Sequence, residues 1–314
     1  MEILNGILQI ISNYVHVYNM MNKNEVVFMK SDEFLNEVLS SDICPNNFEK
    51  IYKEFRQYQK LAINTLNEFH RICEKNKITY QLAYGSLLGA IRDGEQVPWD
   101  YDVDVIVPYE EKDKLIDALK KDLSSQYYFY CPEVDTRCQF FYPRITPKGY
   151  RSDILHVDVF YVVGTPENAI AREKFINEIE KLSRVRFGKK VQIIRESKGN
   201  IKRGIKLFLK KLLAVLSFRN DELKQCYKIC SKYNATKSTV GCLLSPIAKN
   251  NSFFGKDIWD TDLITLDIGT FRVSKQYQML LYNCYKDYQS IPPLKKRLDE
   301  VLIHHKWLTK YSKK

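Results

Sequence analysis

The chain has 314 residues, of which 45% are hydrophobic and 28% are charged, a balance that is typical of globular proteins and excludes a disordered chain or a coiled coil. Its 49 Lys and Arg residues against 38 Asp and Glu residues give a formal charge of +11, which favours a negatively charged partner such as nucleic acid, a phosphorylated substrate or an anionic membrane. The eight cysteines include no CxxC pair and indicate reduced thiols, not a disulfide scaffold. Residues 1–12 are apolar but lack a basic start and a cleavage site, and no run is long enough to span a bilayer. We therefore expect a cytoplasmic protein without a transmembrane anchor.

The hydrophobic pattern predicts a helical accessory region over residues 1–46, followed by a mixed α/β core over residues 47–165. A long amphipathic helix is expected from residue 47 to about 77, and charged residues 110–122 predict a surface helix. A short helix over 87–92 leads into a polar loop. The expected strands are 79–83, 103–107, 127–130, 139–145 and 155–163. This order predicts a small mixed sheet flanked by helices, with helical additions.

The composition changes sharply over residues 184–219, which hold twelve basic residues and one acidic residue, an excess equal to that of the whole chain. Residues 201–218 predict a basic amphipathic helix of the kind that binds anionic bilayers. The alternative is a helix docked on the core with a solvated basic side. We favour membrane contact, and nucleic acid is the least favoured partner because the segment has few aromatic residues for base stacking. The apolar stripe consists of Ile205, Leu209, Leu212, Leu213 and Leu216.

Two carboxylates in the predicted strand 103–107 region point to a metal site. Asp102 and Asp104 are two residues apart, so on a strand they share one face. Like charges held this close raise a pKa unless a cation lies between them, and Mg²⁺ prefers such oxygen ligands together with substrate phosphates. Asp158 lies alone between hydrophobic residues of a later strand and looks like a third acid of the same cluster. The alternative for Asp102 and Asp104 is an edge strand whose exposed face is acidic.

A Gly-Ser turn precedes these acids. Gly85 lets the backbone approach a ligand closely, and Ser86 can cap the following helix or hydrogen-bond a phosphate oxygen at the helix start. Arg92 could clamp a phosphate with two hydrogen bonds, and its alternative role is an ion-pair arginine, with Asp93 as partner.

This arrangement is typical of the nucleotidyltransferase fold, and the motifs resemble the LicD family, which includes bacterial phosphocholine transferases and fukutin-related sugar-phosphate transferases. The resemblance rests on residues 85–92 with 97–104, on His-Val-Asp-Val-Phe at 156–160, and on a C-terminal block over 267–293. It covers about residues 48–160 and 253–305. The sequence departs from the family pattern at Asp93 (commonly His), Tyr101 (an additional Asp), Lys286 (often Gly) and Ser274 (often Pro). Residues 184–219 have no counterpart in the family.

The resemblance implies transfer of a phosphoryl-linked group of the phosphocholine, glycerol phosphate or ribitol phosphate type from a CDP-activated donor to a hydroxyl of a cell-surface glycan or lipid-linked precursor. The acceptor would be of the teichoic acid or lipopolysaccharide kind, and CMP would leave. It implies Mg²⁺, or Mn²⁺, held by Asp102 and Asp104. Asp158 would complete the metal site or accept the acceptor's proton, and Arg92 would offset developing charge. Gly85 and Ser86 would seat the diphosphate, and Asp100 would orient a ligand or add one.

Two other functions remain open: a nucleotidyltransferase that releases pyrophosphate, and a non-catalytic nucleotide-binding protein of the same fold. A domain organisation follows from the same patterns, with a helical insertion over 166–250 that carries the basic segment and a C-terminal block over 251–314 that packs on the core. The expected location is cytoplasmic, with peripheral attachment to the inner membrane face through residues 184–219.

Further candidates carry less chemistry. Trp99 is expected to anchor its loop in the core, and His70 to be structural. A joint metal site of His304 and His305 is not expected, because adjacent helical residues diverge. Trp259 and Phe271 are candidates for an acceptor pocket.

Overall fold

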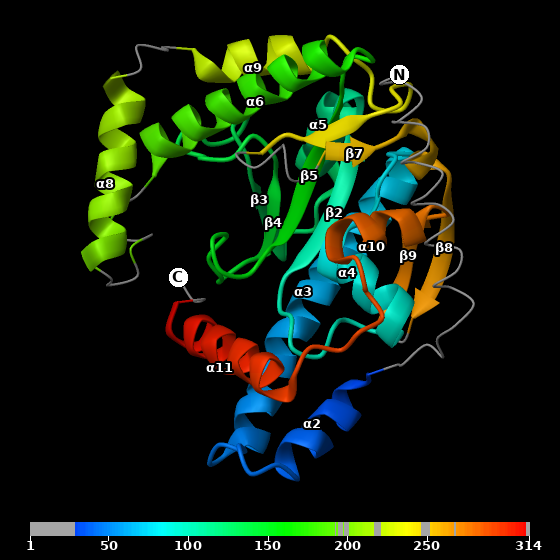
Figure 1. Cartoon of the computed structure of the whole chain (residues 1–314), viewed down its shortest axis with the longest axis vertical. Helices are drawn as coiled ribbons and strands as arrows, with labels where there is room; N and C mark the ends of the chain where they lie inside the picture. The colour runs from blue at the N-terminus through cyan, green and yellow to red at the C-terminus, as the bar shows by residue number, and fades with distance from the viewer. Residues whose placement is uncertain are drawn as a thin grey trace.

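The protein, in a computed structural model, is built around a mixed β-sheet with helices on both sides (Figure 1). The structure describes residues 29–191, 193, 197, 201–216, 221–245, 252–266 and 268–311. The first 28 residues of the expected accessory region, and Asp267 of the C-terminal block, lie outside these described residues. Within the described part of the chain, no helix combines the length and the apolarity needed to cross a membrane.

The elements follow one another as helices and strands in the order that the sequence predicts for the core. The helices are α2 (Ser31–Leu39), α3 (Phe48–Asn76), α4 (Tyr84–Leu88), α5 (Lys112–Asp122), α6 (Ala169–Lys190), α8 (Ile201–Leu216), α9 (Glu222–Cys230), α10 (Tyr277–Tyr285) and α11 (Leu294–Tyr311). The strands are β1 (Gln81–Leu82), β2 (Val103–Pro108), β3 (Tyr127–Tyr130), β4 (Arg144–Pro147), β5 (Val157–Gly164), β6 (Gly241–Leu243), β7 (Ser252–Phe254), β8 (Thr261–Leu266) and β9 (Gly269–Ser274). A π-helical turn (Gly89–Asp93) extends α4, and short 3₁₀ turns cover Tyr109–Glu111 and Lys256–Trp259.

The main sheet has the strand order β1-β2-β5-β4-β3, and β6 pairs with β5 and then with β7. β2 and β5 are parallel, and every other pair in this sheet is antiparallel. The predicted mixed sheet is therefore confirmed. β6 comes from the segment 166–250, so that segment supplies a strand to the sheet as well as helices.

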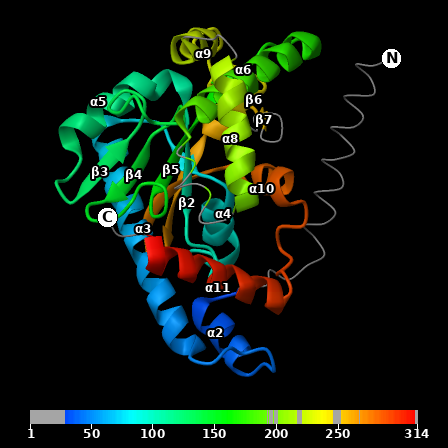
Figure 2. The ribbon, with the colours of Figure 1, turned by 90° about the vertical axis from the view of Figure 1, so that its left-hand side faces the viewer.

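The long helix α3 supports the sheet because its apolar residues recur at helical spacing along its full length. It contacts β2, β4 and β5 on the sheet and packs against α5 and α11. Figure 2, turned by 90°, shows α3 running beside the sheet down to α11. Its completely buried side chains include Phe55, Ala62, Phe69 and Ile72. The helix predicted from residue 47 to about 77 is confirmed.

One predicted strand is largely wrong. Residues 139–143 form no strand, and β4 begins only at Arg144. Pro143 has no N–H to donate to a neighbouring strand, and it directly precedes the first paired residue. The aromatic rings before it pack sideways instead: the Phe140 and Tyr142 ring centroids lie 5.2 Å apart.

The predicted short helix 87–92 begins earlier and ends differently. α4 starts at Tyr84, which has a positive φ of 47°, and the chain continues into the π-helical turn. Gly89 allows this turn, because a Cβ there would meet the backbone of Glu95 and Val97.

Candidate active site

The carboxylates of two neighbouring strands lie side by side at the centre of the sheet. In the parallel pairing of β2 with β5, Asp104 is opposite Asp158, and in the antiparallel pairing of β5 with β4, Asp158 is opposite Arg144. Residues directly opposite on adjacent strands point to the same face. Val103 and Val105 lie on the other face and are buried, as the alternation of the sequence predicts.

Arg144 compensates the charge of Asp158. Its Nε lies 2.6 Å from Oδ1 of Asp158 and its Nη2 lies 3.3 Å from Oδ2. His156 approaches the same carboxylate, with Nε2 3.3 Å from Oδ2. Both side chains of the Arg144–Asp158 pair are about nine-tenths buried. Burial would raise the pKa of the Asp158 carboxyl, but the charges and hydrogen bonds of Arg144 and His156 lower it overall.

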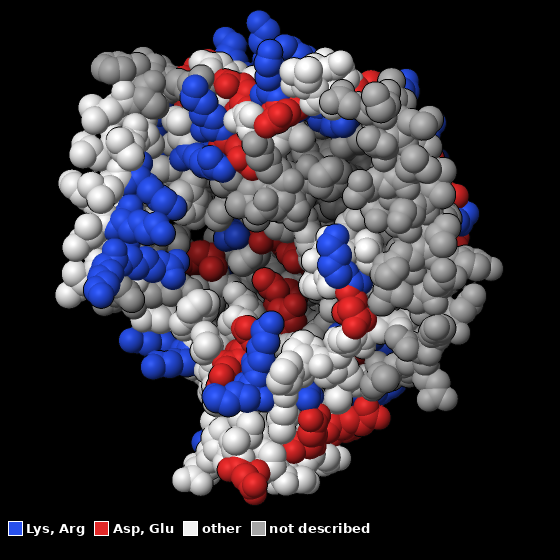
Figure 3. Space-filling view, viewed as in Figure 1, with Lys and Arg blue, Asp and Glu red and all other residues white. Residues whose placement is uncertain are grey.

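Asp100, Asp102 and Asp104 form a second group of acids, and Arg144 offsets the charge of Asp104 only in part. Burial raises the pKa of Asp100 well above its usual value, and the charge of Asp102 and a hydrogen bond with it add to the rise. The pKa of Asp104 is raised by burial first and then by the charges of Asp102 and Asp158. Figure 3 shows acidic side chains gathered in a hollow at the centre of the face seen in Figure 1. Like charges that raise one another's pKa in this way favour a cation beside them.

Hydrogen bonds from helix α3 and within the loop itself hold the loop that carries these acids. Gln59 of α3 donates from Nε2 to the carbonyl oxygen of Val97 at 3.1 Å and also to that of Asp100. Gln96 donates to the carbonyl oxygen of Asp102 at 3.1 Å. The Tyr101 N–H donates to Oδ1 of Asp100 at 2.9 Å. The side chains of the site are therefore positioned by a fixed backbone and not by a free loop.

The Gly-Ser turn braces the same acids. A Cβ at Gly85 would collide with the carboxylate of Asp100, so glycine is required for the close approach of these two residues. Oγ of Ser86 accepts the N–H of Asp104 at 2.9 Å and thereby ties α4 to the start of β2. The turn lies against the carboxylates, and its expected contact with a diphosphate stays a prediction.

Arg92 forms an ion pair with Asp93, which is the alternative to a phosphate clamp that the sequence suggests. Its side chain is only 2% exposed, and Nε and Nη2 donate to the two carboxylate oxygens of Asp93 at 2.7 and 2.8 Å. The guanidinium also lies 5.6 Å from the ring centroid of Trp99. A phosphate clamp at Arg92 needs an accessible guanidinium, and this one is closed off by Asp93 and the core.

Sequence reasoning missed the cation and the tyrosines around the acids. Arg144 gave no signal because its partner comes from a strand pairing between distant segments. Asp104 contributes to the raised pKa of both Tyr84 and Tyr142, and Asp100, Asp102 and Asp104 contribute to the raised pKa of Tyr285, although burial is the main cause in each case. Tyr285 belongs to the C-terminal block, so the block that resembles the family lies against the acids.

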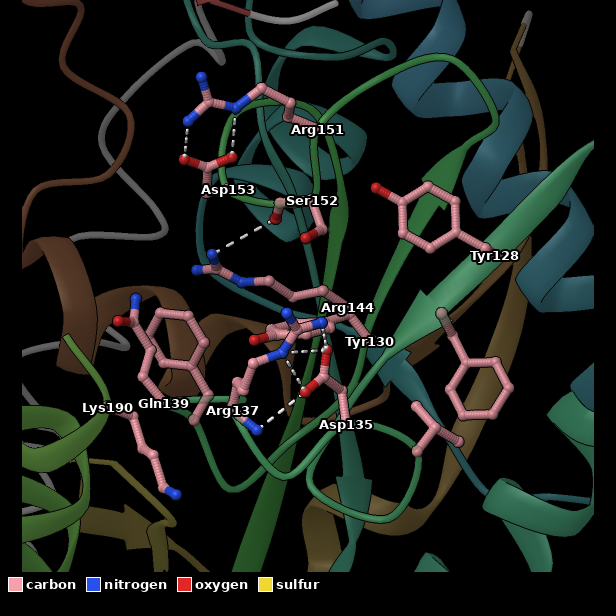
Figure 4. A pocket seen from close by; sticks show the side chains of 13 residues that line it. Tyr128, Tyr130, Asp135, Arg137, Gln139, Arg144, Arg151, Ser152, Asp153 and Lys190 are labelled. Carbon is pink, nitrogen blue, oxygen red and sulfur yellow. Dashed lines mark hydrogen bonds and ion pairs between the residues drawn. The ribbon is translucent and has the colours of Figure 1, made fainter. Parts of the chain in front are cut away.

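A pocket of about 600 Å³ opens beside Arg144, which lines one side of it (Figure 4). Aromatic side chains and two Arg–Asp ion pairs, Arg137 with Asp135 and Arg151 with Asp153, line the space. Arg144 also lines it, and its partner Asp158 is not among the lining residues. The remaining polar and aromatic residues at its wall include Tyr128, Tyr130, Gln139, Phe140, Ser152 and Lys190. A group bound in this pocket could contact Arg144, which in turn binds Asp158.

The remaining candidates lie mostly in structural positions. Trp99 is buried, as expected, and packs on Phe34 with ring centroids 5.6 Å apart. His305 faces Glu54 at 2.8 Å while His304 faces Glu300 at 3.6 Å, so the two histidines diverge as expected. The acceptor-pocket prediction for Phe271 is wrong, because its side chain is completely buried.

Trp259 and His70 are held by hydrogen bonds. Trp259 donates from Nε1 to the carbonyl oxygen of Ala235 at 3.2 Å. Nδ1 of His70 lies 2.5 Å from the Tyr80 hydroxyl oxygen, and burial lowers the pKa of this histidine. The cysteines within the described ranges are all free thiols, and Sγ of Cys226 lies 3.9 Å from Sγ of Cys230.

The side chains as placed do not enclose a metal ion by themselves. Within the described residues, no group of three or more His, Cys, Asp or Glu side chains is arranged to hold one. Mg²⁺ is usually bound by one or two carboxylates and completed by water and substrate phosphates. Asp102 and Asp104 with the adjacent Asp100 fit this mode of binding, since their oxygens and excess negative charge are the donor set that it uses.

Comparison with known proteins shows what this chain is similar to. Residues 77–186 match the family model described as LicD/FKTN/FKRP, nucleotidyltransferase domain. The chain is also 27% identical over 258 residues to the lipopolysaccharide cholinephosphotransferase LicD of Haemophilus influenzae, an alignment that covers 76% of this chain and 92% of that protein. The matched residues contain α4, β2 and β5 with all of the acids described above. The LicD resemblance is therefore confirmed: residues 77–186 of this chain are similar to the nucleotidyltransferase domain of the LicD/FKTN/FKRP family.

Proposed function

We propose that this protein is a metal-dependent transferase that moves a phosphoryl-linked group from a CDP-activated donor to a hydroxyl of a glycan or lipid-linked glycan. The LicD-type domain supports a phosphotransferase of this class. The single observation that carries the proposal is the pairing of Asp104 with Asp158 across β2 and β5, next to Asp100 and Asp102. The related protein from Haemophilus influenzae suggests phosphocholine as the transferred group and lipopolysaccharide as the acceptor.

In this proposal Asp102 and Asp104 hold Mg²⁺ or Mn²⁺, which when bound would offset the charge of the donor's diphosphate. Gly85 and Ser86 keep Asp100 and Asp104 in place beside it. Positioning and charge compensation of this kind supply most of the catalysis in phosphoryl transfer. The acceptor oxygen attacks the β-phosphorus of the donor and its hydroxyl proton passes to water, the bond from that phosphorus to the bridging oxygen breaks, and CMP leaves with the bridging oxygen.

Asp158 and Arg144 act together at the edge of this site. Because Arg144 and His156 already engage both oxygens of Asp158, we propose that Asp158 contributes its charge and its hold on Arg144, while Asp102 and Asp104 are the direct ligands. Arg144 in turn borders the pocket of Figure 4, whose aromatic rings and charged pairs suit a sugar or a sugar phosphate. We assign this pocket to the acceptor.

The test is release of CMP from CDP-choline, CDP-glycerol and CDP-ribitol in the presence of Mg²⁺. We expect Asp104→Asn to lower the rate by roughly 10²–10³-fold, the range seen when one charge-stabilising group is removed from an active site. Asp117→Asn, an exposed carboxylate on α5, is the matched control and should leave the rate unchanged. Residual CMP release near the wild-type rate in Asp104→Asn would remove this residue from the metal site.

Two outcomes would replace the proposal. Release of pyrophosphate from a nucleoside triphosphate, without CMP release from any CDP donor, would assign a nucleotidyltransferase. Metal-dependent nucleotide binding in calorimetry without turnover of either kind would assign a binding protein of the same fold.

A further inference from the structure

Helix α8 presents its apolar stripe to solvent. Ile201, Ile205, Phe208, Leu212 and Val215 follow one another at spacings of four and three residues, so they lie along one face of the helix. The exposed fractions of these side chains are 80, 58, 55, 46 and 58%. Leu209, Leu213 and Leu216 widen the face and are 51, 69 and 54% exposed. An apolar surface this continuous marks an interaction site in a water-soluble domain.

The helix is attached to the protein by its other side. Leu207 and Ala214, seven residues apart, are its two buried residues, and they lie away from the exposed stripe. α8 packs there against α6, where a Cβ at Gly188 would collide with Ala214 and with the backbone of Lys210. α8 is therefore packed on α6 through Leu207 and Ala214 and not through its apolar stripe.

Positive charge surrounds the exposed stripe. α8 contains five basic residues and no acidic residue. Figure 3 shows a band of Lys and Arg side chains over α8. In Figure 2, where the left-hand side of Figure 1 faces the viewer, the helix lies in front. The five residues are Lys202, Arg203, Lys206, Lys210 and Lys211.

This combination of charge and exposure selects the partner. A second copy of the chain, docked stripe to stripe, would bring two rows of lysines together and would be opposed by their repulsion. An anionic bilayer complements the lysines and at the same time takes up the apolar side chains. Leu213 also borders an adjoining groove of about 800 Å³ between α6 and α8, where Val185 and Phe187 are flanked by Lys181 and Arg184.

We propose that α8 is a membrane-docking helix that lies in the interface of an anionic phospholipid bilayer, with the stripe Ile201–Ile205–Phe208–Leu212–Val215 inserted and its lysines at the headgroups. The α6–α8 contact through Gly188 and Ala214 keeps the helix attached to α6 while its opposite side enters the lipid. This inference is independent of the transfer reaction, because it concerns a surface outside the acids and the pocket.

The experiment measures co-sedimentation of the full chain with vesicles of phosphatidylglycerol and phosphatidylcholine, and with phosphatidylcholine alone. We expect binding to the anionic vesicles only, and at least a tenfold loss in the triple variant Ile205→Ser, Phe208→Ser, Leu212→Ser. Lys202→Gln with Lys206→Gln should weaken binding and reduce its dependence on salt. The matched controls are Ile170→Ser on α6 and Leu263→Ser on β8, which remove exposed apolar side chains of 69 and 54% exposure elsewhere.

A second readout reports insertion directly. Phe208→Trp should add a fluorescence component that shifts to shorter wavelength when anionic vesicles are added, and Ile170→Trp should not. The urea midpoint of the triple variant should equal that of the wild type, which excludes misfolding as the cause of lost binding. Equal vesicle binding by the wild type and the triple variant would overturn the proposal. A dimer in light scattering that the triple variant dissociates would assign the face to a second copy instead.

Discussion

The strands at the centre of the sheet and helix α8, which packs on α6, both carry apolar and charged side chains, but they turn opposite sides to the protein. In β2 and β5 the valines are buried, and Asp104 and Asp158 lie opposite each other on the other face of the strands from Val103 and Val105. In α8 the apolar stripe is exposed, and the attachment to α6 uses Leu207 and Ala214. Periodicity thus predicts which residues share a face, whereas the neighbouring elements decide which face is covered.

The two regions also treat charge differently. At the centre, carboxylates are crowded among buried groups, so each charge needs a nearby cation, and Arg144 supplies one for Asp158. On α8 no acidic residue lies beside the basic ones, and Lys211 donates from Nζ only to the carbonyl oxygen of Val191 at 3.3 Å among the contacts found for the described residues. Changes of charge should therefore be costly at the centre and inexpensive on α8.

The largest expected effect on stability is at the buried ion pair. Arg144→Met leaves Asp158 buried without its main cation and should lower the free energy of unfolding by about 3–5 kcal/mol. Arg137→Met is the control, because the Arg137 side chain that pairs with Asp135 is 79% exposed, and the expected loss is much smaller. Urea unfolding measures both. Asp158→Asn added to Arg144→Met should recover part of the lost free energy of unfolding. Equal losses for Arg144→Met and Arg137→Met would show that the buried pair stabilises the protein no more than the exposed one.

The next prediction applies one substitution to both regions. Leu155→Ala, at a completely buried leucine just before β5, should cost about 2–5 kcal/mol, as large-to-small changes in a core do. Leu212→Ala, on the exposed stripe of α8, should change the free energy of unfolding by less than about 0.5 kcal/mol. If Leu212→Ala costs as much as Leu155→Ala in the absence of lipid, the stripe is covered within the protein and the comparison fails.

The smallest expected effects come from two glycines and have opposite signs. Gly188→Ala forces a Cβ against Ala214 and should destabilise the α6–α8 contact by about 1–3 kcal/mol. Gly204→Ala meets only an ordinary contact with Ser197 and should stabilise the protein by about 0.5–1 kcal/mol, because alanine favours a helix. Thermal or urea unfolding distinguishes the two, and stabilisation by both substitutions would mean that α8 does not press on α6.

Local signals predicted most of the fold. α3, β2 and β3 lie close to their predicted bounds because their apolar residues have a clear period and no competing turn residues interrupt them. The strand predicted over 139–145 failed at Pro143, where a run of aromatic residues has the composition of a strand but lacks a donor for pairing.

The candidate site was predictable as far as it rests on local spacing, and its role in catalysis stays a prediction. Asp102 and Asp104 were found because two residues on a strand share a face, and Asp158 because an isolated acid among hydrophobic residues is costly to bury. Arg144 and Tyr285 were not found, because their approach depends on pairing and packing between segments far apart in the chain. Arg92 illustrates the reverse: its neighbour Asp93 was visible in the sequence, and only the structure shows that this neighbour engages it fully.

The parallel alignment of β2 with β5 has a consequence for insertions and deletions in this protein. A shift of one residue between the two strands would move Val105 or Val103 into the position opposite Asp158 and turn Asp104 into the hydrophobic layer. Loops elsewhere can absorb a change of length, but a single codon gained or lost inside either strand would dismantle the acids and the core in one step. We expect naturally occurring length variation in this chain to avoid residues 103–108 and 157–164 and to collect in the connections outside them.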